Sequence, residues 1–338
     1  MRVPIAEEFF QGHISLERGD GWIRPWRVPW AERELYTQSP WVSWSMIRQA
    51  GESTGVRVRF VTAAPAVTLR CEPMDVLRTV DCVIDGRLHA TASLCANAAE
   101  ARFTGLPCTG EKVVELWLPH NAPCAVCGLE VPEGFGAVPA PDTRRRVCIY
   151  GSSITHCQDP ALSPSRTWPA VVAQRRDMSL TCLGFSGHCH LHTLIAHVMR
   201  DVPADLFIMK VGINIYGASS LEGHTFMPNL AGFVRAIRER HPVTPIVVVS
   251  PIYAKKFEVA DIKNSAGMTL ARYRDEVKET VERLTRVCRD DHLTYLDGRD
   301  IFSAEDAESH QADGVHPIAS GTAILAENML ARLESLRV

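Results

Sequence analysis

The sequence predicts two domains: an all-β, jelly-roll-like sandwich followed by an α/β domain whose parallel sheet lies between two layers of helices. A chain of 338 residues is longer than one typical domain and suits two. Near residue 140 the apolar pattern changes from short strands separated by turns to strands that alternate with helices. We therefore expect domains at residues 1–140 and 141–338.

Short strands with frequent turns fill the first domain. Val56–Phe60 alternates apolar and charged side chains, as expected of a strand with one buried face. Asp85-Gly86 between two apolar runs is a strong hairpin signal. Further strands are expected at 66–71, 80–84, 87–90 and 112–118. No segment here has a clear amphipathic helical pattern, so we expect a sandwich.

Five tryptophans gather near the start of the chain. Large aromatic side chains fill cores, and in a sandwich they also stack on sugar rings. We expect the core for most of them. Pro25 and Pro29 argue against an ordinary helix, although three of the tryptophans have helical spacing. The five are Trp22, Trp26, Trp30, Trp41 and Trp44.

The second pattern begins after a linker. Residues 131–141 are rich in proline and glycine and have no periodicity, which is typical of an interdomain connection. The continuous apolar run Val147–Tyr150 then predicts a strand covered on both faces. Further strands are expected at 206–209, 246–249 and 293–296, and helices at 168–174, 191–200, 230–237, 270–287 and from about 320. This alternation favours a parallel sheet, whose ligands bind at the carboxyl ends of the strands.

Composition excludes several classes of partner. Hydrophobic residues make up 46% of the chain and charged residues 22%, and the formal net charge of −3 argues against nucleic acid or an anionic membrane as the main partner. No apolar run is long enough to span a bilayer. The N-terminus has no apolar core of the signal-peptide kind, so we expect a cytoplasmic location.

The 11 cysteines are scattered and odd in number. In a reducing compartment they are expected to be small buried hydrophobes, the alternative being a secreted protein with disulfides. Cys124 and Cys127 form a lone Cys-x-x-Cys without a second pair, which argues against zinc or redox use.

Polar residues follow the predicted strands of the second domain at the edge where an α/β sheet presents its active site. Ser153 stands in a glycine-preceded turn and is the candidate nucleophile. His316 is the candidate base, because imidazole titrates near neutral pH, and Asp313 is close enough in sequence to orient its ring. The backbone N–H groups of Ser153 and Gly187, with the side-chain amide of Asn214, are candidates for an oxyanion hole.

These blocks resemble those of the SGNH/GDSL hydrolase family. Gly151-Ser152-Ser153-Ile154 matches the first block, with Ser152 where the family usually has aspartate; Gly187 matches the second, Asn214 the third, and Asp313-x-x-His316 the last. The resemblance covers residues 145–335. It implies a flavodoxin-like, three-layer domain that acts on esters or thioesters without a metal or organic cofactor. The preceding sandwich is similar in arrangement to that of certain carbohydrate esterases and of SGNH-type acyltransferases.

The expected function is hydrolysis of a small acyl ester or thioester through a Ser-His-Asp triad. One alternative is an acyltransferase that moves the acyl group to an alcohol such as a natural product or sugar. A second alternative is a glycan-binding module with an inactive hydrolase domain. The oligomeric state and the pathway do not follow from the sequence.

Four other residues are candidates for the same site. Ser186 is a rival nucleophile, although Gly187 follows it directly and the Gly-x-Ser-x-Gly elbow is not matched. His188, with other histidines up to 197, resembles a metal cluster, but no separate group completes a tetrahedral set, so His188 is expected to contact substrate instead. Tyr253 and Lys255, after a predicted strand, are further candidate substrate contacts, with the lysine facing an anionic group; the alternative is that this segment is a solvated loop.

Overall fold

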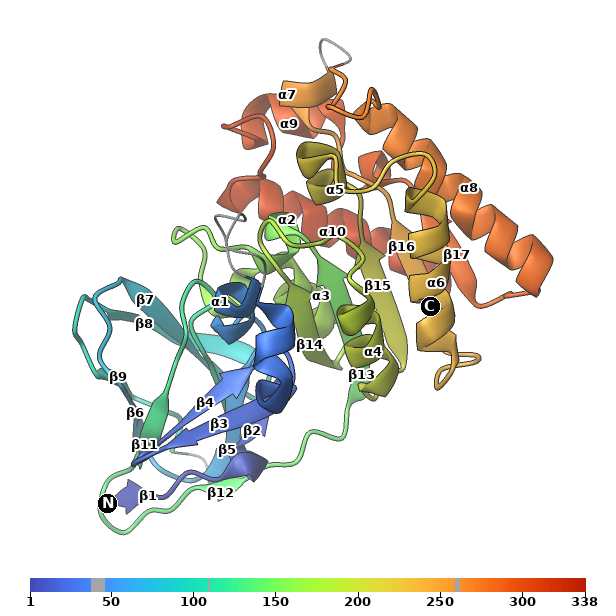
Figure 1. Ribbon diagram of the computed structural model, residues 1–338. Helices are drawn as coiled ribbons and strands as arrows, with labels where there is room; N and C mark the ends of the chain where they lie inside the picture. The colour runs from blue at the N-terminus through green and yellow to red at the C-terminus, as the bar shows by residue number, and fades with distance from the viewer. Residues whose placement is uncertain (38–45, 109, 259–261) are drawn as a thin grey trace. The chain divides into compact units, whose positions relative to one another are not determined.

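The computed structural model describes residues 1–37, 46–108, 110–258 and 262–338, which form two compact units (Figure 1). The first unit comprises Met1–Arg144 and Cys157–Cys182, and the second comprises Arg145–His156 and Leu183–Val338. Most of the chain after residue 140 therefore lies in the second unit, while one segment of it joins the first. Trp41 and Trp44 lie outside the described residues.

Two six-stranded antiparallel sheets make up the body of the first unit. In one sheet the order is β3-β4-β11-β6-β9, with β1 beside β11; in the other it is β12-β5-β10-β7-β8, with β2 beside β5. The first sheet contains β1 (Arg2–Val3), β3 (Ser15–Gly19), β4 (Trp22–Trp26), β6 (Ala66–Cys71), β9 (Glu100–Thr104) and β11 (Val126–Glu130). The second contains β2 (Phe10–Gln11), β5 (Arg57–Thr62), β7 (Arg78–Ile84), β8 (Arg87–Leu94), β10 (Lys112–Trp117) and β12 (Val138–Pro139).

Both sheets bury their inner faces in one apolar core. Leu69 and Phe103 come from the first sheet, and Phe60 and Leu116 from the second. Two facing sheets whose strands alternate inward and outward residues form a sandwich. The predicted all-β sandwich is thus confirmed.

The hairpin between β7 and β8 forms at Asp85-Gly86, as the sequence predicts. Ile84 pairs with Arg87, and both turn residues have a positive φ, 48° for Asp85 and 79° for Gly86. A two-residue hairpin turn of this hand requires left-handed backbone at both positions, which aspartate and glycine tolerate.

The segment that carries the first three tryptophans is a strand followed by a short helix. Trp22 and Trp26 lie on β4, which also contains Pro25. Proline is tolerated in a strand only at special positions. A 3-10 helix begins at Trp30, directly after Pro29. Trp26 is buried and its ring centroid lies 4.6 Å from that of Trp30. The helices of this unit are η1 (Glu7–Phe9), η2 (Trp30–Tyr36), α1 (Met46–Gly51), η3 (Pro164–Arg166) and α3 (Trp168–Arg175). Among them only α3 was predicted.

Arg57 on β5 corrects one expectation. The alternating pattern places this arginine on a solvent face, but its side chain is completely buried. Its guanidinium donates to Asp142 Oδ2 at 2.9 Å, Ser179 Oγ at 2.7 Å and the Leu180 carbonyl at 2.9 Å, and Glu115 lies 3.8 Å away. A buried charge needs such partners, so an ion network overrides the alternation.

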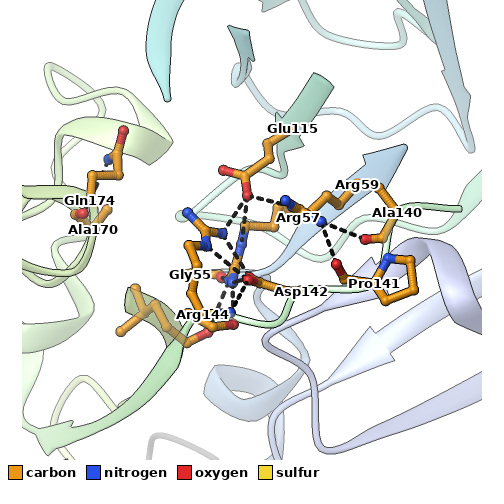
Figure 2. A network of polar contacts seen from close by, with 12 residues as sticks. Gly55, Arg57, Arg59, Glu115, Ala140, Pro141, Asp142, Arg144, Ala170 and Gln174 are labelled. Atoms are coloured by element: carbon orange, nitrogen blue, oxygen red, sulfur yellow. Dashed lines mark hydrogen bonds and ion pairs between the residues drawn. The ribbon is translucent and has the colours of Figure 1, made fainter. Parts of the chain in front are cut away.

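The same network attaches the predicted linker to β5. Arg144 donates to Asp142 Oδ2 at 2.7 Å and to Glu115 Oε1 at 2.5 Å (Figure 2). Arg59 donates to the carbonyl of Ala140 at 2.7 Å, and Val138–Pro139 pairs with β5 as the short strand β12. The linker therefore has regular pairing and charged anchors that its composition did not reveal.

Asp81 explains why Cys157–Cys182 belongs to the first unit. This carboxylate on β7 is buried and accepts hydrogen bonds from Ser163 Oγ at 2.7 Å, from Ser165 N at 2.8 Å and from Ser165 Oγ at 2.6 Å. Hydrogen bonds to a buried charged acceptor are among the stronger ones in proteins.

A five-stranded sheet of order β14-β13-β15-β16-β17, flanked by helices, organises the second unit, to which β14 contributes only its last two residues (Figure 1). Its last three pairings along this order are parallel, as predicted. The strands are β13 (Arg145–Gly151), β14 (Met178–Gly184), β15 (Leu206–Lys210), β16 (Ile246–Val249) and β17 (Leu293–Leu296). The helices are α2 (Ser153–His156), α4 (Thr193–Asp201), α5 (Ile213–Ala218), α6 (Phe226–Arg238), α7 (Lys255–Glu258), α8 (Leu270–Cys288), η4 (Gly298–Asp300), α9 (Ala304–His310) and α10 (Ala319–Ser335).

Every residue of β15 and β16 is buried, as expected of strands covered on both faces. Helix α8 shows the complementary pattern, because Tyr273, Val277 and Leu284 recur at helical spacing on its buried side. The predicted α/β domain is confirmed. Among the described residues, no helix combines the length and apolarity needed to cross a bilayer.

Candidate active site

The turn that carries Ser153 depends on a glycine. β13 ends at Gly151, where a Cβ atom would lie 2.1 Å from Thr155 Oγ1, so no other residue fits without displacing the turn. Ser152 is buried, and its carbonyl accepts hydrogen bonds from the amides of Thr155 and His156, both at 2.9 Å. These bonds start α2 and place Ser153 at its first position.

Ser153, His316 and Asp313 form a continuous hydrogen-bonded relay. His316 Nδ1 lies 2.6 Å from Asp313 Oδ2, and His316 Nε2 lies 2.8 Å from Ser153 Oγ. Because an ionised carboxylate only accepts, Nδ1 carries the proton, and Nε2 is free to accept the serine hydroxyl proton. The structure brings the three predicted residues together.

Asp313 also stabilises the loop that carries His316. Its Oδ1 accepts the amide of Val315 at 2.8 Å and that of His316 at 2.6 Å. Burial raises the pKa of Asp313, but hydrogen bonds from the amide and ring of His316 and from the Val315 amide outweigh it, so the pKa lies below its ordinary value. The carboxylate is therefore ionised when His316 is to act as a base. The loop follows α9 rather than the last strand directly.

Gly187 lies in the loop after β14 with a φ of 75°, a backbone conformation that suits glycine. Its carbonyl is 2.9 Å from His190 Nε2, which must donate because a carbonyl only accepts. His190 Nδ1 then accepts the hydroxyl of Ser220 at 2.7 Å. No local pattern in the sequence marks the contact between His190 and Ser220.

Asn214 is anchored to the same loop. It lies in the first turn of α5, and its Oδ1 accepts the amide of Cys189 at 3.1 Å. Since the carbonyl end is occupied, the Nδ2 end points to other partners, and within the described residues it makes no hydrogen bond. Two donor hydrogens are thus available to an anionic oxygen.

Two contacts connect the Ser153 turn with the Gly187 loop. A Cβ atom at Gly184 would lie 2.5 Å from the amide nitrogen of His156, so α2 packs directly on the end of β14. His156 Nδ1 lies 3.2 Å from Ser186 Oγ and 3.4 Å from the Ser186 amide. Ser186, the rival nucleophile, therefore has a histidine neighbour of its own. The only sequence signal for His156 is its place one turn after Ser153.

The three candidate substrate contacts have different environments. His188 is buried, and burial, followed by the neighbouring His190 and His192, lowers its pKa to about 4. Tyr253 is half-buried, with its carbonyl 2.9 Å from Gln311 Nε2.

Lys255 lies on a hollow beside the Asp313 loop. A cavity of about 370 Å³ is lined by Lys255, Lys256, Glu308, Gln311 and Asp313, among others. Lys255 Nζ is 2.5 Å from Glu308 Oε2, and both side chains are exposed. Lys255, which was expected to face an anionic group, is thus ion-paired with the carboxylate of Glu308.

The histidines after Gly187 do not converge on one point. The rings of His190 and His192 stack, with centroids 5.7 Å apart, and both nitrogens of His190 have protein partners. In the described part of the chain, no group of three or more His, Cys, Asp or Glu side chains is arranged to hold a metal ion.

Two family models match the chain. Residues 144–334 match the GDSL-like lipase/acylhydrolase family, and residues 9–124 match the family described as the SsfX3 N-terminal domain. No curated protein matches the chain.

Solved structures resemble both units. The salicylyl-acyltransferase SsfX3 from a tetracycline biosynthetic pathway is 32% identical, with a TM-score of 0.87 over 97% of this chain and 94% of that chain. A putative GDSL-like lipase from Bacteroides ovatus is 20% identical, with a TM-score of 0.74 over 99% and 97%. A family two carbohydrate esterase from Cellvibrio japonicus is 14% identical, with a TM-score of 0.65 over 99% and 97%, and these last two likenesses concern the fold alone.

The matched model spans more than half of the chain, and its residues include the Ser153 turn, the Gly187 loop, Asn214 and the Asp313–His316 loop. The chain belongs to the GDSL-like lipase/acylhydrolase family.

Proposed function

We propose that residues 141–338 form the catalytic domain of a serine esterase that cleaves an ester or thioester of a small acyl group. The observation that carries this proposal is the relay from Ser153 through His316 to Asp313, with contacts of 2.8 and 2.6 Å. A hydroxyl beside a carboxylate-oriented imidazole is suited to nucleophilic acyl transfer. Membership of an acylhydrolase family supports the same chemistry.

In the first half-reaction, Ser153 Oγ attacks the carbonyl carbon while its proton passes to His316 Nε2. Asp313 stabilises the imidazolium that results, because its ionised carboxylate accepts the Nδ1 proton in a hydrogen bond. The tetrahedral intermediate then collapses. The bond to the leaving alcohol or thiol breaks, and His316 returns the proton to it.

The developing oxyanion requires donors that are already oriented. We assign this role to the backbone N–H groups of Ser153 and Gly187 and to Asn214 Nδ2. The hydrogen bond from Cys189 to Asn214 Oδ1 supports the assignment, because it fixes the amide without using its donors. His190 supports it too, since it holds the carbonyl of Gly187.

In the second half-reaction water attacks the acyl group on Ser153, with His316 again as base. The test is hydrolysis of short p-nitrophenyl esters and of a simple thioester, with mass spectrometry of the trapped acyl-enzyme. We expect an acyl group on the Ser153 peptide in the wild type and in Ser186→Ala, and neither adduct nor turnover in Ser153→Ala. An adduct on Ser186 would contradict the assignment.

The second candidate is an acyltransferase, in which an alcohol replaces water as the acceptor. A specific observation favours it: the salicylyl-acyltransferase is similar over 97% of this chain, through both family models. The acyl-enzyme and the relay are the same in both hypotheses. Only exclusion of water and positioning of the acceptor distinguish them.

Product partitioning separates these two functions. A benzoyl or salicylyl thioester serves as the donor, and free acid and new ester are measured as an alcohol acceptor is added. A transferase gives mostly ester at acceptor concentrations far below that of water, whereas an esterase gives free acid. No turnover and no adduct with any donor would contradict both and favour a glycan-binding module with an inactive hydrolase domain.

His188, Tyr253 and Lys255 remain proposed substrate contacts. Lys255 is the most testable, because its cavity also includes Asp313. If Lys255 binds an anionic donor, Lys255→Ala raises KM for an anionic thioester and leaves KM for a neutral p-nitrophenyl ester unchanged. Arg283→Ala, on the exposed side of α8, is the control.

A further inference from the structure

The side chain of Gln311 connects two backbone segments of the second unit. It is buried, with an exposed fraction of 5%. Its Nε2 donates to the carbonyl of Tyr253 at 2.9 Å and to that of Val315 at 3.0 Å, and its Oε1 accepts the amide of Lys255 at 3.0 Å. These partners fix which end of the side chain is the nitrogen, because two carbonyls can face only donors. Both N–H groups and the oxygen of this side chain are thus bonded to backbone.

One of these bonds holds the peptide that joins Val315 to His316. The carbonyl of this peptide accepts a hydrogen bond from Gln311 Nε2 at 3.0 Å, and its N–H donates to Asp313 Oδ1 at 2.6 Å. Because a peptide is planar, bonds to both of its polar groups fix the whole plane. The Cα atom of His316 belongs to that plane, so the direction in which the imidazole ring leaves the backbone is fixed with it.

The ring of His316 depends on such bonds because packing around it is sparse. The side chains of His316 and Asp313 are 49% and 56% exposed, so much of their surface contacts solvent instead of neighbouring side chains. The ends of their loop meet where the Ile318 amide donates to the His310 carbonyl at 2.9 Å. Between these ends, Gln311 connects the loop to the rest of the unit.

The other two bonds of this amide reach residues 251–258, a segment that is itself firmly anchored. Arg274 on α8 is 2% exposed and donates to the carbonyls of Pro251 at 2.8 Å and Ile252 at 2.9 Å. Its guanidinium also forms a bidentate pair with Glu258, with contacts of 2.6 and 3.0 Å. Bidentate charged pairs are strong and geometrically specific. The segment is therefore a rigid support for the amide.

We propose that Gln311 is a positioning residue for the catalytic base: it holds the Val315–His316 peptide against residues 251–258, so that His316 Nε2 stays in reach of Ser153 Oγ. This inference rests on the proposed function, in which His316 is the base. Without the bond from Gln311 the peptide can rotate, and the 2.8 Å contact between His316 and Ser153 is no longer maintained. A misplacement of about 1 Å can cost about 10²-fold in rate.

Gln311→Met tests the proposal, because methionine has a similar size and shape but makes none of the three hydrogen bonds. With a short p-nitrophenyl ester as substrate, we expect kcat to fall by about 10–10²-fold. KM should stay unchanged, because Gln311 acts through His316 and not through the substrate. Both constants are measured on protein shown to be folded by circular dichroism.

Gln174→Met is the matched control. The Gln174 side chain also donates to two backbone carbonyls, those of Ser165 at 2.8 Å and Ala170 at 3.1 Å, but it lies in the first unit. The control variant should lose stability and keep the kcat of the wild type. A wild-type kcat in Gln311→Met, or an equal fall in both variants, would overturn the proposal.

NMR of the His316 ring nitrogens gives a readout that needs no turnover. In the wild type and in Gln174→Met we expect the proton on Nδ1, where Asp313 accepts it. In Gln311→Met we expect signals averaged over both tautomers, because the ring no longer stays beside Asp313. If no ester is hydrolysed but the signals differ in this way, the proposed function fails and the positioning of the ring stands. Identical ring signals in the wild type and Gln311→Met would overturn the positioning alone.

If Gln311→Met does not fold, the wild-type side chain decides. Protons that are bonded to carbonyls in a buried site exchange slowly with solvent. We expect the two Nε2 protons of Gln311 to give separate NMR signals and to exchange at least about tenfold more slowly than those of free glutamine. Exchange at the rate of free glutamine would contradict the proposal, because the bond to Val315 would then not be maintained in solution.

Discussion

Gly184 and the backbone of His156 are in direct contact: a Cβ atom at position 184 would lie 2.5 Å from the His156 nitrogen and 2.8 Å from its Cα. Such distances require the backbone to move, because neither atom belongs to a flexible side chain. The contact fixes the short helix α2, and with it Ser153, against the end of β14. The position of Ser153 thus depends on a residue without a side chain.

Gly184→Ala is therefore expected to reduce activity and to lower the free energy of unfolding by about 1–3 kcal/mol, the usual cost of overpacking. Urea unfolding and ester hydrolysis measure the two effects. The matched control is Gly232→Ala in the interior of α6, where no atom lies within 4 Å of the new Cβ. It should stabilise the protein by about 0.5–1 kcal/mol and leave kcat unchanged. If the two variants have the same free energy of unfolding and the same activity, the contact between Gly184 and His156 does not position Ser153.

Asp313→Asn removes the charge that orients and stabilises the His316 ring. We expect kcat to fall by about 10²–10⁴-fold with little change in KM, because the ground-state contacts of the substrate are untouched. The amide can still accept the Val315 and His316 N–H groups at Oδ1, so folding should be retained. Asp291→Asn, an exposed aspartate outside the site, is the control. A kcat equal to that of the wild type in Asp313→Asn would show that Ser153 and His316 catalyse the reaction without the charge of Asp313.

Substitutions of Asn214 test the third proposed oxyanion donor. Asn214→Ala should lower kcat by about 10²–10³-fold, the usual cost of one such donor. Asn214→Asp keeps an acceptor for the Cys189 amide but replaces the donor end by negative charge, so its kcat should be at least as low. The control is Asn229→Ala on α6, whose side-chain amide donates to the carbonyl of Thr225 at the start of the same helix. Activity retained in Asn214→Asp would remove Asn214 from the oxyanion hole.

The residues of the Ser153–His316–Asp313 relay are easier to predict from the sequence than the contacts that hold them in place. Ser153 is predictable because it follows the first strand of the alternating pattern, and Asp313 and His316 are predictable from their spacing in one loop, although α9 separates that loop from the last strand. The Asp85-Gly86 hairpin is equally local. By contrast, Arg57 and His156 take their roles from residues distant in the chain, and nothing in their neighbourhood indicates the partner. The attachment of Cys157–Cys182 to the first unit, through Asp81, has the same long-range cause.

The histidines around the Gly187 loop make stability dependent on pH. Burial, followed by neighbouring histidines, lowers the pKa values of His188 and His192 to about 4, below the unfolded value of 6.5. Between these values the unfolded chain takes up protons that the folded protein does not. The free energy of unfolding therefore falls as pH decreases from 6.5 towards 4. Urea unfolding at several pH values should show a shallower fall in His188→Gln, and an unchanged one in His224→Gln, an exposed control.

The charged network around Arg57 gives the last prediction. Asp142 is 1% exposed, and Arg57, which it pairs at 2.9 Å, is 0% exposed. Burial raises the pKa of Asp142, but Arg144 and Arg57 outweigh it and hold the pKa well below its ordinary range, so the carboxylate stays ionised wherever the protein is folded at moderate pH. Asp142→Asn should lower the free energy of unfolding by about 3–5 kcal/mol, because it leaves a buried guanidinium without its nearest counter-ion.

Asp201→Asn is the matched control, since Asp201 pairs with Arg200 and Arg240 at the surface and should change stability little. Adding salt separates the two cases further. Salt screens the exposed pairs but barely reaches the buried one, so the loss in Asp142→Asn should persist at high ionic strength. A loss that disappears with salt would mean that solvent reaches Arg57, and that the attachment of the linker to β5 rests on the Val138–Pro139 strand pairing instead.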